Sequence, residues 1–361
     1  MRKILFIASH RKDRSPSQRF RFEQYFEFLK QNNFDPELSN LLSEEDDKSF
    51  YTKGRFLNKA VLLVKGFFKR WKDLKGAKNA DIVFVQREAF MTGSVFFEKK
   101  MSRNKNKLVF DFDDSIWILD TSDANKKWEW LKDPAKTSRI IALSDMVFAG
   151  NQYLAEYAKK FNKNVLIVPT TIDTSEYKRS GPVNNNETIC IGWSGSITTI
   201  KHFEYAIPFL LRIKKKYGKR LLIKVIGDSS YFHEELEISG VAWTKKEEIK
   251  ELSEFDIGIM PLPFDEWTKG KCGLKGLQYM ALEIPTIMSP VGVNTEIIDD
   301  GINGFLADTE EEWMEKISCL IDSFELRQRI GKKGRETVEK GYSVESQKNI
   351  YLQAFNELLK R

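Results

Sequence analysis

Short apolar runs alternate with amphipathic stretches along most of the chain. Both faces of each run are apolar, which predicts buried parallel strands. In the first half these runs are residues 3–8, 81–86, 107–111, 146–149 and 164–168. Helical patterns separate them, at residues 20–29, 55–78, 91–103, 124–142 and 151–161. A regular succession of strand and helix predicts a doubly wound α/β domain.

The pattern breaks between Pro169 and Asn186 and then starts again. This segment carries prolines, a glycine and three consecutive asparagines, which is typical of an interdomain linker. Beyond it, strands are predicted at 188–192, 221–226, 257–260 and 286–288, and helices at 201–216, 245–253, 273–283, 309–322 and 325–340. The sequence therefore predicts an α/β protein with two Rossmann-like, doubly wound domains facing across a deep interdomain cleft. Their predicted bounds are 1–170 and 187–340, with a linker at 171–186 and a C-terminal helix at 341–361 that crosses back to the first domain.

Composition narrows the class of protein. Of 361 residues, 41% are hydrophobic and 30% charged, as in soluble globular proteins, and a net charge of +6 is too small to indicate nucleic-acid binding. Three widely spaced cysteines exclude a full disulfide framework and fit a reducing compartment, and no Cys/His cluster has metal-ligand spacing. The first apolar run stops at Ser9, too soon for a signal peptide, and no stretch reaches the roughly 18–20 apolar residues that span a bilayer. We therefore expect a cytoplasmic protein.

A glycine-rich turn follows the first strand of the second half. Gly192, Ser194, Gly195 and Ser196 lie between a predicted strand and a predicted helix that carries Lys201. Backbone N–H groups and a helix N-terminus at such a turn can bind a phosphate. Neither the Gly-x-Gly-x-x-Gly fingerprint nor a Walker loop is present, which weighs against NAD binding and a simple ATPase. The alternative is a tight turn that binds no ligand.

A second candidate site lies at residues 266–281. Gly270 and Gly273 allow the backbone to approach a ligand closely, and lysines that include Lys271 and Lys275 flank a helix beginning near Gly273. The helix dipole, its first N–H groups and the ammonium groups together suit a dianionic leaving group such as a nucleoside diphosphate. The alternative is a cluster of solvated lysines.

Both segments resemble the family-4 nucleotide-sugar glycosyltransferases of the GT-B fold, and the likeness covers essentially the whole chain. Further stretches that carry it are residues 150–154, 168–173, 225–228, 290–298 and 300–306. The last of these matches the family's Gly-x-x-Gly-Phe/Leu turn. The resemblance implies a hexosyltransferase that moves a sugar from a nucleotide diphosphate sugar to an acceptor hydroxyl with retention. It implies no required cofactor or metal.

The resemblance also implies which residues form the donor site. Those assigned to the diphosphate are Gly192, Ser194, Gly195, Ser196, Lys201, Lys271 and Lys275. Those assigned to the donor sugar and ribose are Cys272, Gly273, Leu274, Gln278 and Glu296, and Trp243 is assigned to the base. The chain departs from the family at Ser196, where an arginine is frequent, and at Gly270 and Gln278, which stand in the positions of two glutamates. Lys271 and the backbone N–H groups of residues 272–274 are expected to compensate.

Two aspartates follow the strand at 107–111. Asp113 and Asp114 are predicted to be catalytic because functional residues gather at the C-terminal ends of such strands. Asp113 stands where many relatives carry a histidine, and a carboxylate there can hydrogen-bond a sugar hydroxyl or accept the acceptor's proton. The alternatives are a metal-binding Asp-x-Asp pair and a helix cap.

The loop after the first strand is predicted to open on the acceptor side. Arg19 or Arg21 is expected to bind an acceptor phosphate or carboxylate, the alternative being a solvated charge.

Residues 53–78 carry nine basic side chains, one acidic side chain (Asp73) and interleaved apolar residues. A basic amphipathic helix of this kind predicts contact with an anionic membrane surface. The alternative is a helix that packs its apolar face on the sheet and leaves its lysines in water.

The sequence therefore predicts a glycosyltransferase of cell-surface polysaccharide or glycolipid synthesis. Its expected partners are a nucleotide sugar, a glycan or lipid-linked acceptor, and the inner face of a membrane, with no nucleic acid. Two alternatives stay open: a nucleotide-sugar epimerase of the same fold, and a catalytically silent protein that binds sugar nucleotides.

Overall fold

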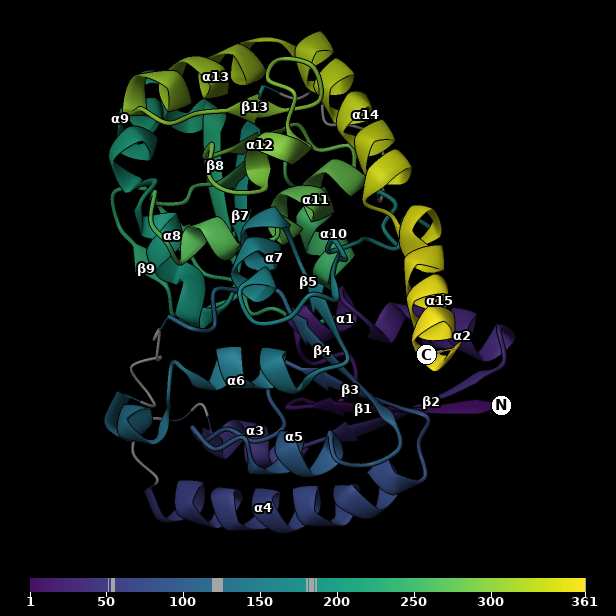
Figure 1. Cartoon of the computed structure of the whole chain (residues 1–361). Helices are drawn as coiled ribbons and strands as arrows, with labels where there is room; N and C mark the ends of the chain where they lie inside the picture. The colour runs from purple at the N-terminus through teal and green to yellow at the C-terminus, as the bar shows by residue number, and fades with distance from the viewer. Residues whose placement is uncertain are drawn as a thin grey trace. The chain divides into compact units, whose positions relative to one another are not determined.

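The computed structural model describes residues 1–50, 52, 56–118, 126–179, 181, 185 and 187–360, which form two compact units (Figure 1). The first unit comprises Met1–Pro169 and Gln347–Arg361, and the second comprises Thr170–Ser346. Each unit is built around its own parallel β-sheet, as the alternation of apolar runs and helices predicts.

The sheet of the first unit has six strands in the order β2-β1-β3-β4-β5-β6, all parallel. Their bounds are β1 Arg2–Ala8, β2 Phe34–Asn40, β3 Ile82–Gln86, β4 Lys107–Phe112, β5 Met146–Ala149 and β6 Val165–Ile167. The central strands β3 and β5 are buried at every residue, because helices cover both faces of the sheet.

Strand β2 is not predicted by the hydrophobic pattern. Its sequence, FDPELSN, is largely polar and contains Pro36. The strand lies at the edge of the sheet, where a proline removes no hydrogen bond between neighbouring strands and the outer side needs no apolar cover.

Helices α3, α4 and α5 lie on one side of this sheet and α2 on the other (Figure 1). The helices of the first unit are α1 Pro16–Arg19, α2 Phe26–Gln31, α3 Glu44–Phe50, α4 Phe56–Lys78, α5 Phe96–Met101, α6 Lys136–Leu143 and α7 Gln152–Lys159, with 3-10 turns η1 Glu23–Tyr25 and η2 Lys126–Leu131. No helix in the described part of the chain is long and apolar enough to cross a membrane.

Helix α15 (Val344–Lys360) carries the chain from the second unit into the first. Tyr351 and Phe355 are buried there among aromatic rings of the first unit. The Tyr351 ring stacks on Tyr25 with centroids 4.4 Å apart, and Phe355 stacks on Phe148 at 5.9 Å. Side chains of α15 therefore form part of the hydrophobic core of the first unit.

The second unit contains a five-stranded parallel sheet in the order β13-β12-β11-β7-β8. Its strands are β7 Ile189–Ser194, β8 Leu221–Ile226, β11 Ile257–Met260, β12 Thr286–Met288 and β13 Phe305–Leu306, and β9 Phe232–His233 pairs with β10 Ile238–Ser239 in a separate hairpin. Its helices are η3 Ile197–Thr199, α8 Ile200–Glu204, α9 Ile207–Tyr217, η4 Gly218–Arg220, α10 Glu248–Ser253, η5 Thr268–Gly270, α11 Leu274–Ala281, α12 Asn294–Ile297, α13 Glu310–Asp322 and α14 Phe324–Gly341.

Part of the predicted linker packs on the second unit. The N–H of Ile172 donates to the Tyr342 carbonyl at 2.8 Å, and the Tyr177 hydroxyl donates to Glu248 at 2.7 Å. Residues 180, 182–184 and 186 of that segment lie outside the described residues.

Candidate functional site

The glycine turn after β7 is shaped by packing. A Cβ on Gly192 would lie 2.0 Å from the Phe255 ring, and one on Gly195 would lie 2.1 Å from the Trp193 ring. Both distances are far below van der Waals contact, so only glycine fits at either position. The close packing of backbone on rings accounts for these glycines whether or not the turn binds a phosphate.

Hydrogen bonds fix the shape of this turn. Ser194 donates its N–H to the Tyr279 hydroxyl at 2.8 Å, which ties the end of β7 to helix α11. Ser196 caps η3: its N–H donates to the Thr199 hydroxyl oxygen at 2.9 Å, and the Thr199 N–H donates back to the Ser196 carbonyl at 2.9 Å. The predicted residues Ser194 and Ser196 are therefore parts of a pre-formed turn.

Three lysines lie close enough to a buried histidine for their charges to act on it. Lys201 comes from α8, Lys275 from the first turn of α11, and Lys271 from the segment just before α11. Burial, together with the positive charges of these three lysines, lowers the pKa of His202 to about 3. His202 is 3% exposed, and its Nδ1 has no hydrogen-bond partner among the described residues. The structure thus brings cations from two distant segments to one place, where they favour an anion.

Two of these lysines lie against indole rings. The Lys271 ammonium is 5.2 Å from the centre of the Trp267 ring, and that of Lys275 is 5.2 Å from the centre of Trp193. A cation over an indole face is held there by the ring's quadrupole, which restricts where it can point. Neighbouring Lys269 instead pairs with Glu266. Lys271 and Lys275 are thus the lysines of this segment that are held by indole faces.

Helix α11 begins in a conformation that requires glycine. Gly273 has φ +68, and no side chain caps the helix. The backbone N–H groups of the first turn, at Leu274 and Lys275, have no partner within the helix by its geometry. Cys272, just before it, is buried with its Sγ 3.7 Å from the Gly270 carbonyl oxygen. This uncapped turn with a lysine in it is suited to an anionic ligand.

Gln278 and Trp243 meet at Glu248, a residue that the sequence pattern does not single out. The Gln278 amide donates to Glu248 at 3.2 Å and to the Tyr177 hydroxyl at 2.9 Å. The Trp243 indole N–H donates to the same carboxylate at 2.9 Å. Glu248 therefore orients both side chains, and Tyr177 orients Gln278. Glu296, also assigned to the donor, is exposed on α12.

In the first unit, Asp113 and Asp114 share one arginine. The Arg87 Nε donates to Asp113 at 2.8 Å, and a second guanidinium nitrogen donates to Asp114. Burial by itself would lower the pKa of Arg87, but the two carboxylates outweigh it and raise that pKa. Residues 115–118 are not helical, so neither aspartate caps a helix directly after it. Within the described residues, no group of three or more His, Cys, Asp or Glu side chains is arranged to hold a metal ion.

Arg19 and Arg21 are both buried inside the first unit. Arg21 is fully buried, and its guanidinium donates to Asp111 and to the Val168 carbonyl. Arg19 lies with its guanidinium 4.8 Å from the centre of the Phe20 ring. A fully buried, paired guanidinium braces the ends of the strands, and an acceptor cannot reach it in this structure.

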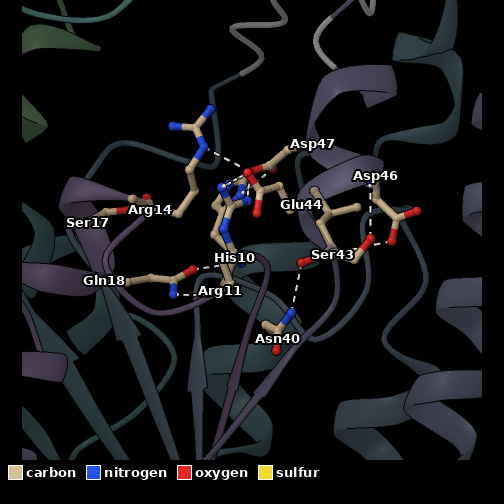
Figure 2. Close-up of polar contacts among 12 residues, drawn as sticks. His10, Arg11, Arg14, Ser17, Gln18, Asn40, Ser43, Glu44, Asp46 and Asp47 are labelled. Atoms are coloured by element: carbon tan, nitrogen blue, oxygen red, sulfur yellow. Dashed lines mark hydrogen bonds and ion pairs between the residues drawn. The ribbon is translucent and has the colours of Figure 1, made fainter. Parts of the chain in front are cut away.

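The same loop presents other basic side chains around Asp47 of α3 (Figure 2). Arg11 donates to the Asp47 carboxylate at 2.6 Å, Arg14 donates at 2.8 Å, and the His10 Nδ1 lies 3.3 Å from it. Burial by itself would raise the pKa of Asp47, but hydrogen bonds and charge from His10 and Arg14 outweigh it and lower that pKa. Both arginines keep more than a third of their surface exposed, so the partly accessible arginines of this loop are Arg11 and Arg14.

Residues 188–323, which include the glycine turn, the three lysines and α11, match the family described as "Glycosyl transferases group 1". Solved structures are similar over the whole chain. A glycosyltransferase from Rickettsia africae has a TM-score of 0.67 at 16% identity, covering 100% of this chain and 99% of its own. The chain has the GT-B glycosyltransferase fold.

Two further GT-B structures agree with this. Sucrose-phosphate synthase from Thermosynechococcus elongatus has a TM-score of 0.70 at 13% identity, with 100% of both chains covered. Anabaena HepE in complex with UDP and glucose has a TM-score of 0.66 at 13% identity, covering 99% of this chain and 100% of its own. Among curated proteins, none matches this chain by sequence. The match of residues 188–323 supports a glycosyltransferase activity for this GT-B chain.

Proposed function

We propose that the protein is a hexosyltransferase that moves a sugar from a nucleotide diphosphate sugar to a hydroxyl of a glycan or lipid-linked acceptor. In this proposal the second unit holds the donor and the first unit holds the acceptor. The transfer retains the anomeric configuration and serves the synthesis of cell-surface polysaccharide or glycolipid. It takes place in the cytoplasm at the inner face of a membrane, and it requires no cofactor.

The convergence of Lys201, Lys271 and Lys275 on His202 carries the proposal. When the bond from the sugar to the diphosphate breaks, the leaving diphosphate gains negative charge. Fixed cations and uncapped backbone N–H groups stabilise that charge most where it develops, which accelerates the step. Lys271 and Lys275, held by indole faces, need little reorganisation to meet it.

His202 fits the same role as a neutral group. Its depressed pKa keeps the imidazole uncharged near neutral pH. A buried Nδ1 without a partner among the described residues has a cost in stability, and a phosphate oxygen at this place would relieve it if Nδ1 carries the proton.

The buried network around Glu248 supports a place for the nucleoside. In this proposal Trp243, oriented by Glu248, stacks on the base, and the carbonyl oxygen of the Gln278 amide accepts from a ribose hydroxyl. The solved structure of HepE holds UDP and glucose, and this chain shares its fold, so UDP-glucose is the first donor to test.

Asp113 and Asp114, fixed by Arg87, are proposed to position the acceptor hydroxyl. Arg87 sets the direction of both carboxylates, so its loss should disturb turnover as much as the loss of either aspartate.

The test is transfer from a panel of nucleotide sugars, with and without glycan and lipid acceptors. We expect release of the nucleoside diphosphate only when an acceptor is present, and proton NMR of the product should show the anomeric configuration of the donor. Interconversion of the donor sugar without an acceptor would instead identify an epimerase. Donor binding without release on any acceptor would identify a silent binding protein. Either outcome contradicts the proposal.

A further inference from the structure

The outer face of helix α4 is apolar. Leu57, Val61, Val64, Phe68 and Trp71 are spaced alternately four and three residues apart, which places them along one side of the helix. We call them the α4 stripe. Their side chains are between 50% and 83% exposed. In Figure 1, α4 runs along the lower edge of the first unit with no described element beyond it.

The opposite face of α4 is the one that packs on the unit. Leu62, Gly66 and Arg70 are buried there. The fully buried Arg70 donates to the carbonyl of Ala8 and, at 2.8 Å, to the carboxylate of Asp73. The helix is therefore anchored through this face, and most of the α4 stripe is left uncovered by that packing. A solvent-facing row of large apolar side chains is unfavourable unless something covers it.

Positive charge surrounds the α4 stripe. Lys72, Lys75 and Lys78 of α4 are exposed, and so are Lys99 and Lys100 of the adjoining helix α5, whereas Lys65 pairs with Asp46 at 3.0 Å. Trp71 stacks on Phe96 of α5 with ring centroids 6.0 Å apart, and the Lys100 ammonium lies 5.7 Å from the centre of that ring. Asp73, the one acidic residue of α4, is engaged by Arg70.

We propose that the α4 stripe docks on an anionic lipid bilayer, with its apolar side chains in the interfacial region and its lysines at the headgroups. Exposed apolar side chains flanked by lysines match both parts of such a surface, and tryptophan and phenylalanine prefer its boundary. Charge selects lipid over a second copy of this chain, because two such faces would oppose lysine to lysine. The inference stands on this surface alone and does not rest on the proposed enzymatic activity.

The test is sedimentation of the full chain with vesicles of neutral phosphatidylcholine and with vesicles containing 30% phosphatidylglycerol. We expect binding to the anionic vesicles only, weakened at 0.5 M NaCl. Leu57→Ser/Val64→Ser/Phe68→Ser should weaken binding by at least about tenfold, since the side chains no longer favour the lipid. Lys72→Gln/Lys75→Gln/Lys78→Gln should weaken it by at least about tenfold through lost charge.

Matched controls lie on the second unit. Leu222→Ser/Phe232→Ser/Ile302→Ser removes three similarly exposed apolar side chains, and Lys219→Gln/Lys246→Gln/Lys332→Gln removes three exposed lysines. Both should bind vesicles like the wild type. No vesicle binding by the wild type would overturn the inference. So would binding that the serine variant keeps, or a wild-type dimer that this variant dissolves. Binding of nucleoside diphosphate by the same variants is measured in parallel, so loss of donor binding is not mistaken for loss of docking.

Discussion

His202 shows how a single residue depends on its surroundings. It lies in the middle of α8, close enough to Lys201, Lys271 and Lys275 for their charges to act on it. Burial and three like charges both oppose its protonation, so the folded protein holds it neutral where a free imidazole would be partly charged. Its neutrality thus follows from its burial and from the same cations that we assign to the donor diphosphate.

The low pKa of His202 predicts a dependence of stability on pH. This pKa falls from 6.5 to about 3 on folding, so above pH 6.5 the residue contributes no pH dependence. Below pH 6.5 only the unfolded chain takes up the proton, and stability should fall by about 1.4 kcal/mol per pH unit until about pH 3. Urea unfolding of wild type and His202→Gln between pH 4.5 and 8 measures it. On acidification the free energy of unfolding of the wild type should fall relative to that of His202→Gln. A difference between the two that stays constant with pH would show that His202 is not held neutral.

For single residues, the sequence predicts which residue types form the site but not which side chains contact one another. The glycine turn, Lys271 and Lys275 are predicted from local patterns of glycine and lysine beside helix starts, whereas Lys201 is predicted from the family resemblance. Glu248 and Arg87 cannot be found in this way. Each looks like an ordinary surface charge, and its role comes from side chains that the fold brings from elsewhere in the chain.

Among the helices, the start of α11 has a strict local requirement for glycine. Gly273→Ala would place a Cβ 2.4 Å from the Ile297 Cδ1 in a left-handed backbone. The backbone alone should cost about 1–2 kcal/mol, and donor affinity should fall because the turn shifts. Gly341→Ala is the control, since a Cβ at that position would have no atom within 4 Å and the φ of Gly341 is not positive. Chemical denaturation and nucleotide titration of both variants measure the difference, and equal stabilities would contradict this requirement.

Helix α4 shows what periodicity alone cannot determine. The pattern correctly predicts a basic amphipathic helix, since residues 56–78 form one. Apolar side chains occur on more than one side of it, and the side that packs on the unit contains Gly66 and Arg70 because Arg70 binds carbonyl and carboxylate oxygens there. The choice of face is made by partners distant in sequence. The hydrophobic pattern does not predict edge strand β2 for a related reason. This strand forms because it pairs with β1, and its own composition does not indicate that pairing.

In the molecule as a whole, helix α15 at the C-terminal end stabilises the first unit. Phe355 of α15 is fully buried among Phe34, Phe84 and Phe148. Phe355→Ala should destabilise the first unit by about 3–5 kcal/mol, because it leaves a cavity in this aromatic core. Gln353→Ala, at an exposed position of the same helix, is the control and should change stability little. Calorimetry of both variants measures this, and unfolding of Phe355→Ala at the wild-type temperature would count against the packing of α15.

The proposed function depends above all on one interaction. The second unit must bind the diphosphate group of a nucleotide sugar through Lys201, Lys271 and Lys275. Calorimetric titration with UDP, GDP and ADP and with their monophosphates tests this binding most directly. One diphosphate should bind more tightly than its monophosphate. Lys271→Ala and Lys275→Ala should each weaken the diphosphate by about ten- to a hundredfold, as expected for lost charged contacts, while Lys269→Ala leaves it about unchanged. If none of the diphosphates binds, or if all three variants bind alike, the lysines do not form the donor site.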